Sequence, residues 1–277
     1  MLSLVGYAAK DQHATKRATG VENADMTAHS PHFAVVCDGV SGVPPPLRAE
    51  DLARDMRDCL RVFLSQRFSP HTSRQEFDKG VADYLFPPVH GVPSTWKAPT
   101  AGSWLVLLSM LAAMHTTALG STCFAVACII GQKLTCFNLG DCTVALFRWN
   151  YAVGVWQMLF KTNESRVMMI DAYGNSVMGP HQFSVPNLAS RDHAHVAQSI
   201  GHGEAHVVND VKQSDVLMVY SDGVGDNATP SELCRILGAH AQGDDRAVAH
   251  AILDYCKRPA APKPDDISIF VGTVVAA

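Results

Sequence analysis

Several apolar stretches of this chain end in an aspartate, and two of these aspartates are followed directly by glycine. The stretches read VVCDG at Asp38, VYSDG at Asp222 and NLGDC at Asp141, and the acid pair Asp265-Asp266 precedes the last apolar stretch. An aspartate at a strand end directs its carboxylate toward the edge of the sheet, and a neighbouring glycine lets a backbone carbonyl approach a cation closely. One Asp-Gly pair is only a common turn, so the signal lies in the recurrence. Together these strand ends predict an all-oxygen site suited to Mg²⁺ or Mn²⁺.

Hydrophobic patterning predicts the elements that position these aspartates. Short apolar runs bounded by turn residues predict strands at 2–9, 32–37, 123–130, 134–138, 143–149, 153–160, 216–220 and 267–275. Helical spacing, or one long apolar block, predicts helices at 48–68, 103–119, 230–239 and 244–257. We interpret 103–119 as a buried helix and not as a membrane span, because His115 and four hydroxyl residues dilute its apolar character.

The order of these elements indicates the fold class. Strands 123–130, 134–138 and 143–149 are separated by turns at Gly131-Gln132 and Gly140-Asp141, which is typical of an antiparallel meander. Strands grouped in this way, with helices in separate blocks, favour a layered α+β fold over a doubly wound parallel sheet. The length of 277 residues and the apolar content of 47% suit one domain that covers the whole chain.

Two stretches lie outside the expected elements. Residues 86–100 are rich in Pro and Gly and are expected to form a surface excursion, and the polar segment 162–213 is expected to form a long loop-rich excursion. The second stretch contains a histidine cluster, His193, His195, His202 and His206. This cluster has two interpretations, a transition-metal site or a polar loop whose histidines are solvated or partly packed.

Composition narrows the range of functions. The formal net charge is −4 and no basic stripe is present, which argues against a nucleic-acid partner. The eight cysteines include no C-x-x-C pair, so we expect reduced, buried thiols and no zinc cluster or disulfide framework. The first residues lack a basic start and a long apolar core, so no signal peptide is predicted. We expect an intracellular protein that does not insert into a membrane.

Read in order, the motifs resemble those of the metal-dependent protein phosphatases of the protein phosphatase 2C type (the PPM family). The matching motifs are Glu22-Asn23-Ala24, VVCDGVSG at 35–42, Gly120-Ser121-Thr122, NLGD at 138–141, SDGV at 221–224 with Asp226-Asn227, and KPDDIS at 263–268. They span nearly the whole chain and are most similar to the branch with Asp-Gly-Val in place of Asp-Gly-His, which includes mitochondrial phosphatases. The resemblance implies a four-layer α-β-β-α sandwich, with two central antiparallel sheets flanked by helices.

The resemblance also implies an activity, the hydrolysis of phosphoserine and phosphothreonine by a water bridging two Mn²⁺ or Mg²⁺ ions. The implied metal ligands are Glu22, Asp38, Gly39, Asp141, Asp222 and Asp266. Among them Asp38 bridges the two metals, Asp222 and Asp266 hold one of them, and Asp141 corresponds to the ligand of a third, weaker ion in some members. Asp38, Asp222 and Asp266 are therefore the expected catalytic residues, and a phosphoprotein is the expected substrate.

The chain departs from the family pattern at three places. Asn23 stands where a second acid usually follows the glutamate, with Asp25 two positions on. The phosphate-binding arginine falls at Ala18, so the adjacent Arg17 is the expected phosphate ligand and Lys16 a second candidate. Val40 stands where the family has the histidine that protonates the leaving group, and the Asp-Gly-Val branch manages without that histidine.

These departures leave an alternative open, a pseudophosphatase that serves as a binding or scaffolding subunit. The enzyme is expected to be a monomer, and the pseudophosphatase a subunit of an assembly. A haloacid-dehalogenase or receiver-like domain is set aside, because Asp38 is followed by Gly-Val and no Asp-x-Asp nucleophile is present. The compartment is expected to be the cytoplasm or the mitochondrion, although a strand that starts at residue 2 leaves no room for a transit peptide.

Overall fold

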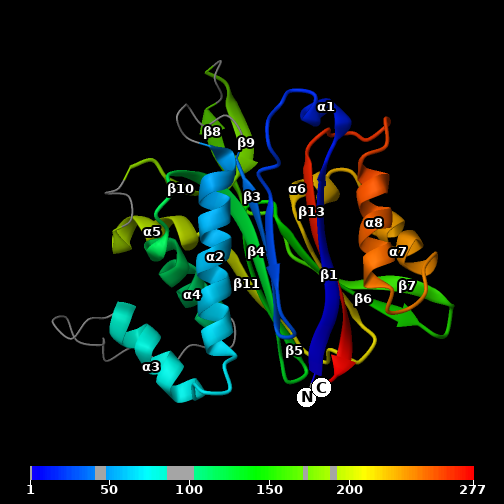
Figure 1. Ribbon diagram of the computed structural model, residues 1–277, viewed down its shortest axis with the longest axis horizontal. Coiled ribbons are helices and arrows are strands. Elements are labelled where there is room, and N and C mark those ends of the chain that lie inside the picture. The colour runs from blue at the N-terminus through cyan, green and yellow to red at the C-terminus, as the bar shows by residue number, and fades with distance from the viewer. Residues whose placement is uncertain (1, 41–47, 86–102, 171–173, 188–191) are drawn as a thin grey trace.

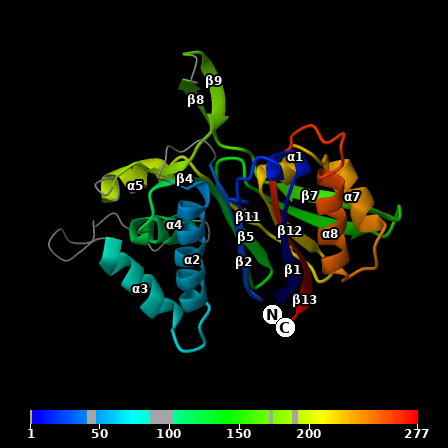
Figure 2. The same cartoon turned by 45° about the horizontal axis from the view of Figure 1, so that its top comes forward.

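Two large antiparallel sheets stack face to face in the computed structural model, which describes residues 2–40, 48–85, 103–170, 174–187 and 192–277 (Figure 1). In spatial order the first sheet consists of β1 (Leu2–Gln12), β13 (Asp266–Ala276), β12 (Val216–Tyr220), β6 (Thr143–Asn150) and β7 (Val155–Lys161). The second consists of β11 (Glu204–Val208), β5 (Lys133–Leu139), β4 (Gly120–Ile130), β3 (Phe33–Gly39) and β2 (Met26–His29), with β10 (Phe183–Val185) paired to β4. A separate hairpin, β8 (Arg166–Ile170) and β9 (Ser176–Pro180), projects away from both sheets (Figures 1 and 2).

Helices cover the outer faces of both sheets (Figure 1). On the second sheet these are α2 (Ala49–Arg67), α4 (Ser103–His115) and α5 (His193–Ile200), and α3 (Arg74–Leu85) packs against α4 and α2. On the first sheet they are α7 (Pro230–Gly238) and α8 (Asp245–Cys256). The short helices α1 (Ala14–Arg17) and α6 (Asp222–Gly225) lie at one end of the sandwich. The predicted α-β-β-α arrangement is confirmed. Within the described residues, no helix is both long and apolar enough to span a bilayer.

Alternation along β3 shows how the core orients the residue at the end of the strand. Ala34 and Val36 point between the two sheets, whereas Val35 and Cys37 pack against α2. Burial of each large apolar side chain contributes roughly 1.5–3 kcal/mol. That energy holds the register of the strand, because a slip of one residue turns every side chain to the opposite face. The same alternation places Asp38 on the side that faces the other sheet.

Most of the expected elements are present. The helices expected at 48–68, 230–239 and 244–257 are α2, α7 and α8, the strand at 216–220 is β12, and the block at 103–119 forms α4. All eight cysteines are free thiols, of which six are buried and two, Cys59 and Cys234, are half-buried. The structure adds β2 and α3, which the patterning did not reveal.

Two expectations about the organisation are wrong. The predicted meander does not continue past Gly140-Asp141, because β5 lies in one sheet and β6 in the other, so this turn carries the chain across the sandwich. The segment 162–213 is not mainly loop, since it contains β8 to β11 and α5. The excursion expected at 86–100 lies outside the described residues.

Candidate active site

The strand ends that carry the aspartates meet at one end of the sandwich, opposite the two chain termini (Figure 1). The pairing of neighbouring strands places these strand ends at the same end of the sandwich. Gln12 at the end of β1 pairs with Asp266 at the start of β13, and Gly39 at the end of β3 pairs with Thr122 near the start of β4. The end of β12 pairs with the start of β6 in the same way. The recurrent strand-end aspartates of the sequence therefore share one neighbourhood.

A cleft of about 250 Å³ opens at this end and is lined by four carboxylates from separate parts of the chain. Asp38 comes from β3, Asp141 from the β5–β6 turn, Asp222 from the start of α6 and Asp265 from the loop before β13. Gly39, Lys16, Lys263 and Cys123 also line the cleft. The structure thus brings together three of the predicted acidic ligands, and it adds Asp265 from the acid pair.

Close backbone packing holds the start of α6 against the start of β13. A Cβ atom added to Gly223 would lie 1.8 Å from the carbonyl oxygen of Asp266, so only glycine permits this approach. Buried Asn227 ties the two segments together. Its Nδ2 donates to the carbonyls of Gly223 (2.9 Å) and Lys263 (2.7 Å), and its Oδ1 accepts from the Lys263 amide (2.9 Å). Asn227 therefore sets the spacing between the Asp222 and Asp265 segments of the cleft.

We expect Asn227→Ala to destabilise the fold by about 2–3 kcal/mol, because it leaves buried backbone groups without their partners. Urea unfolding measures the change. Asn150→Ala is the matched control, since Asn150 also makes two side-chain bonds, but on a surface turn near Ala152. A loss no larger for Asn227→Ala than for the control contradicts the positioning role.

Asp25 lies beside Asp38, although it was only a secondary possibility in the sequence. Its side chain is fully buried, Oδ2 accepts a hydrogen bond from Ser221 Oγ (2.7 Å), and the carboxyl interacts electrostatically with that of Asp38. Burial, with added repulsion from Asp266 and Asp222, raises the pKa of Asp25 to about 7. Burial and the Asp25 charge likewise raise the pKa of Asp38 well above its usual range, although one side of Asp38 faces the cleft. Two adjacent carboxylates of this kind need a shared proton or a cation.

Asp266 is placed behind the cleft wall. Its side chain is almost fully buried, Oδ1 accepts from Gln12 Nε2 (2.9 Å), and Oδ2 accepts from the Ala24 amide (3.0 Å) and lies 3.0 Å from Lys16 Nζ. Asp265 is the member of the pair that lines the cleft. The role expected of Asp266 as a metal ligand stays a prediction, and Asp265 enters as a candidate that the sequence did not single out.

Glu22 and Arg17 are not brought into the cleft. The Glu22 side chain is 72% exposed and pairs with Arg48 Nη2 (2.7 Å), and the Arg17 side chain is 62% exposed and pairs with Asp11. Lys16 does line the cleft, with Nζ 2.5 Å from Asp265 Oδ1. The roles expected of Glu22 and Arg17 stay predictions, whereas the geometry favours Lys16 over Arg17 as the phosphate-binding candidate, since Lys16 is the one that lines the cleft.

The Asn23 side chain forms hydrogen bonds with the backbone near Asp25. Its Nδ2 donates to the Asp11 carbonyl (2.6 Å), and its Oδ1 accepts from the Asp25 amide (2.9 Å). The amide side chain therefore shapes the turn that delivers Asp25 to the cluster. An asparagine at this position suits that task, because it donates and accepts at once.

The donor set fits a hard divalent cation. The side-chain atoms that could bind a cation here are carboxylate oxygens, which such cations prefer. Two of these oxygens, Asp25 Oδ1 and Asp141 Oδ1, are buried without a hydrogen-bond partner. Burial and the charge of Asp222 raise the pKa of Asp141 to about 6. Within the described ranges, however, no three His, Cys, Asp or Glu side chains already surround one point as metal ligands do. Lysine ammonium groups lie among the carboxylates instead.

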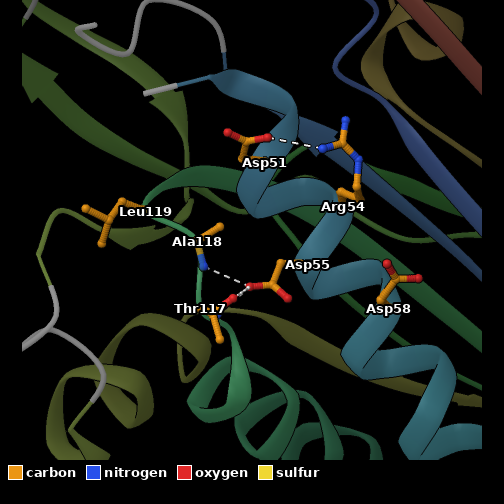
Figure 3. Close-up of a pocket in the computed structure, with 7 residues that line it drawn as sticks. All are labelled: Asp51, Arg54, Asp55, Asp58, Thr117, Ala118 and Leu119. Atoms are coloured by element: carbon orange, nitrogen blue, oxygen red, sulfur yellow. Dashed lines mark hydrogen bonds and ion pairs between the residues drawn. The ribbon is translucent and has the colours of Figure 1, made fainter. Parts of the chain in front are cut away.

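A second acidic cleft of about 340 Å³ lies along α2 and has a different character. Figure 3 shows Asp51, Asp55 and Asp58 on one side of this helix. Asp55 Oδ2 accepts from Thr117 Oγ1 (3.0 Å) and from the Ala118 amide (2.8 Å), and Asp51 pairs with Arg54 in the same helix (Figure 3). These contacts fasten the α4–β4 connection to α2, which is a structural role.

The described histidine side chains of 193–206 make separate contacts. His195 Nε2 is 2.9 Å from the Ser184 carbonyl, His202 stacks on His181, and His206 pairs with Glu204. The part of the chain that the structure describes holds no metal-ligand group here. Of the two interpretations, the geometry favours a partly packed polar segment.

No family model and no curated protein matches the sequence. Solved structures do match the fold. The photosystem II phosphatase PBCP is 19% identical, with a TM-score of 0.68 over 99% of this chain and 100% of that one. The catalytic domain of the serine threonine protein phosphatase PstP, in complex with two manganese ions, is 13% identical, with a TM-score of 0.56 over 100% of both chains. The PPM Ser-Thr phosphatase MsPP from Mycobacterium smegmatis, in complex with cacodylate, is 12% identical, with a TM-score of 0.54 over 99% of both chains. This chain therefore has the PPM phosphatase fold.

Proposed function

We propose that this protein is a metal-dependent serine/threonine protein phosphatase that acts on phosphoproteins as a monomer. The observation that carries the proposal is the meeting of Asp38, Asp141, Asp222 and Asp265 in one cleft, with the buried carboxyl of Asp25 behind it. Such a concentration of carboxylates is costly unless cations offset the repulsion. The cleft lies in a fold that the PPM phosphatases share. PstP, which has this fold, is seen with two manganese ions.

We assign the metal-holding roles to Asp38, Asp222 and Asp265, with Asp25 supporting Asp38 and Asp141 available to a further ion. Asp265 takes the role that the resemblance implied for Asp266, because Asp265 lines the cleft and Asp266 is bonded to Gln12 and Ala24. The chemistry that Mn²⁺ or Mg²⁺ supplies in such a site is activation of a water and neutralisation of phosphate charge.

The other cleft residues would orient the phosphate. Lys16 carries a positive charge on the wall of the cleft, where it can pair with a phosphate oxygen in place of the arginine that the family uses. Gln182, which follows the β8–β9 hairpin, is a neutral donor on the same cleft. Val40 is apolar and cannot transfer a proton, so protonation of the leaving group falls to solvent.

We expect release of phosphate from a phosphothreonine peptide in the presence of Mn²⁺, and its loss after exhaustive chelation, because the proposed nucleophile is a metal-activated water and the thiol that lines the cleft is not ionised. Burial raises the pKa of the cleft thiol Cys123 far above neutrality, which keeps it protonated. Malachite green detection of phosphate measures the reaction, and readdition of Mn²⁺ is the control. Activity that survives chelation contradicts the mechanism.

The pseudophosphatase alternative keeps one supporting observation. Lys16 and Lys263 already neutralise part of the carboxylate cluster, as a scaffold that binds no metal would require. On that alternative the same assay shows no hydrolysis at saturating Mn²⁺, and the peptide still binds.

A further inference from the structure

The ammonium group of Lys263 lies among three carboxylates at the mouth of the cleft. Nζ contacts Asp222 Oδ2 directly, and it lies 3.1 Å from Asp226 Oδ2 and 3.1 Å from Asp265 Oδ2. The side chain is 41% exposed, so the ion pairs lie at the rim and not in the core. Burial lowers the pKa of Lys263, but the charge and hydrogen bond of Asp222 outweigh it, and the net pKa is above the ordinary lysine value. One cation of this chain thus occupies a position between two proposed metal ligands.

The backbone of Lys263 is held in place, so this position is not that of a freely moving surface lysine. Its amide donates to Asn227 Oδ1 (2.9 Å) and its carbonyl accepts from Asn227 Nδ2 (2.7 Å). Only the side chain is left to move. Its four carbon–carbon torsions allow the ammonium to leave the carboxylates while the loop stays where it is.

The cluster retains buried carboxyl oxygens without a partner even with the lysines in place. Asp25 Oδ1 is fully buried and has no partner, and Asp141 Oδ1 is likewise buried and unpaired. These atoms point to a ligand that carries more than one positive charge and accepts several oxygen donors at once, which describes a divalent cation and not an ammonium.

We propose that Lys263 is a built-in counter-ion that competes with a divalent cation for Asp222 and Asp265, and that it thereby sets the metal affinity of the cleft. The inference rests on the proposed metal-dependent phosphatase function. Because an ammonium and a divalent cation repel each other at short range, Mn²⁺ must displace the side chain before both carboxylates can bind it. The free energy needed to displace the side chain makes the free energy of Mn²⁺ binding less favourable by the same amount.

The test compares Lys263→Gln with Lys257→Gln after removal of metal by chelation and dialysis. Lys257 is a matched control, since Nζ also pairs with two carboxylates, those of Asp11 (2.6 Å) and Asp254 (3.0 Å), away from the cleft. We expect Lys263→Gln to bind Mn²⁺ about tenfold more tightly by titration calorimetry, in the range that residues around a metal typically control. Lys257→Gln should bind within about twofold of the unaltered protein, because its partners are not in the cleft.

A second measurement uses the same proteins without metal. In chelator, Lys263→Gln should melt at a lower temperature than Lys257→Gln, because three carboxylates lose their shared counter-ion. An unchanged or weaker Mn²⁺ affinity in Lys263→Gln overturns the inference, and so does the absence of binding in all three proteins, which also removes the proposed metal centre. Tighter binding without hydrolysis of phosphopeptide in any of them supports the counter-ion role and contradicts the phosphatase function alone.

Discussion

Replacing Asp38 with asparagine is expected to reduce phosphatase turnover about a thousandfold, which corresponds to ~4 kcal/mol of transition-state stabilisation. Asp38 is the proposed ligand at the end of β3 that lines the cleft beside Asp25, so we expect its carboxylate to be essential to the centre. An amide of the same shape keeps the packing but has no charge to hold a cation. Turnover of a phosphothreonine peptide at saturating Mn²⁺ measures the effect.

The same substitution should not unfold the protein. Burial raises the folded-state pKa of Asp38 above its unfolded value, so ionised Asp38 opposes folding as the pH rises through that raised pKa. At pH 8 in chelator, Asp38→Asn is therefore expected to be at least as stable as the unaltered protein. Asp51→Asn is the control for a general effect of removing an acid, because Asp51 lies in the α2 cleft and pairs only with Arg54 among its described ion pairs (Figure 3). Near-normal turnover of Asp38→Asn would show that the centre lies elsewhere.

Strand-end aspartates could be found in the sequence because two local rules combine. Alternation in 33–39 orients Asp38, and an antiparallel arrangement returns the chain to the same edge with every second strand. Both rules act over a few residues, so they are visible without a structure. The neighbourhood of Asp38, Asp141 and Asp222 follows from them.

The choice among nearby acids could not be read in the same way. Glu22 and Asp25 are three residues apart. Only the packing of the segment before β2 against Ser221 shows that Asp25 is the buried one. β13 begins at Asp266. Strand alternation therefore orients Asp266, whereas the loop before the strand orients Asp265. A motif can be matched almost equally well to either of two acids that lie one to three residues apart. The tertiary contacts distinguish between them.

The errors in the fold have physical causes as well. A glycine turn between two strands has the same local chemistry whether the strands pair or separate, and Gly140, with φ +88°, serves here as a crossover between sheets. The β8–β9 hairpin gives no alternating signal, because Met168, Val177 and Met178 are exposed although they lie in strands. Where the described side chains of a hairpin are exposed on both faces, the sequence shows no hydrophobic period.

Replacing Gly223 with alanine is expected to destabilise the protein by about 2–3 kcal/mol and to weaken Mn²⁺ binding at least tenfold. The added Cβ atom would lie 1.8 Å from the carbonyl oxygen of Asp266, and backbone cannot rotate away as a flexible side chain can. Relief of the clash requires α6 to move from the start of β13, and that movement separates Asp222 from Asp265. Urea unfolding in chelator and titration calorimetry measure the two effects separately.

Gly225→Ala provides the matched control for Gly223→Ala, because it adds the same methyl group to the same short helix. The nearest atom to its Cβ position is Tyr220 Cε2 at 3.7 Å, an ordinary van der Waals distance. We expect the free energy of unfolding to change by no more than about 0.5–1 kcal/mol, and to increase, because alanine has a better helix propensity than glycine. If both alanine variants bind Mn²⁺ as tightly as the unaltered protein, the approach of α6 to β13 does not set the geometry of the metal centre. If only Gly223→Ala loses affinity, the backbone contact between Gly223 and Asp266 is what holds Asp222 and Asp265 at a separation that one cation can bridge.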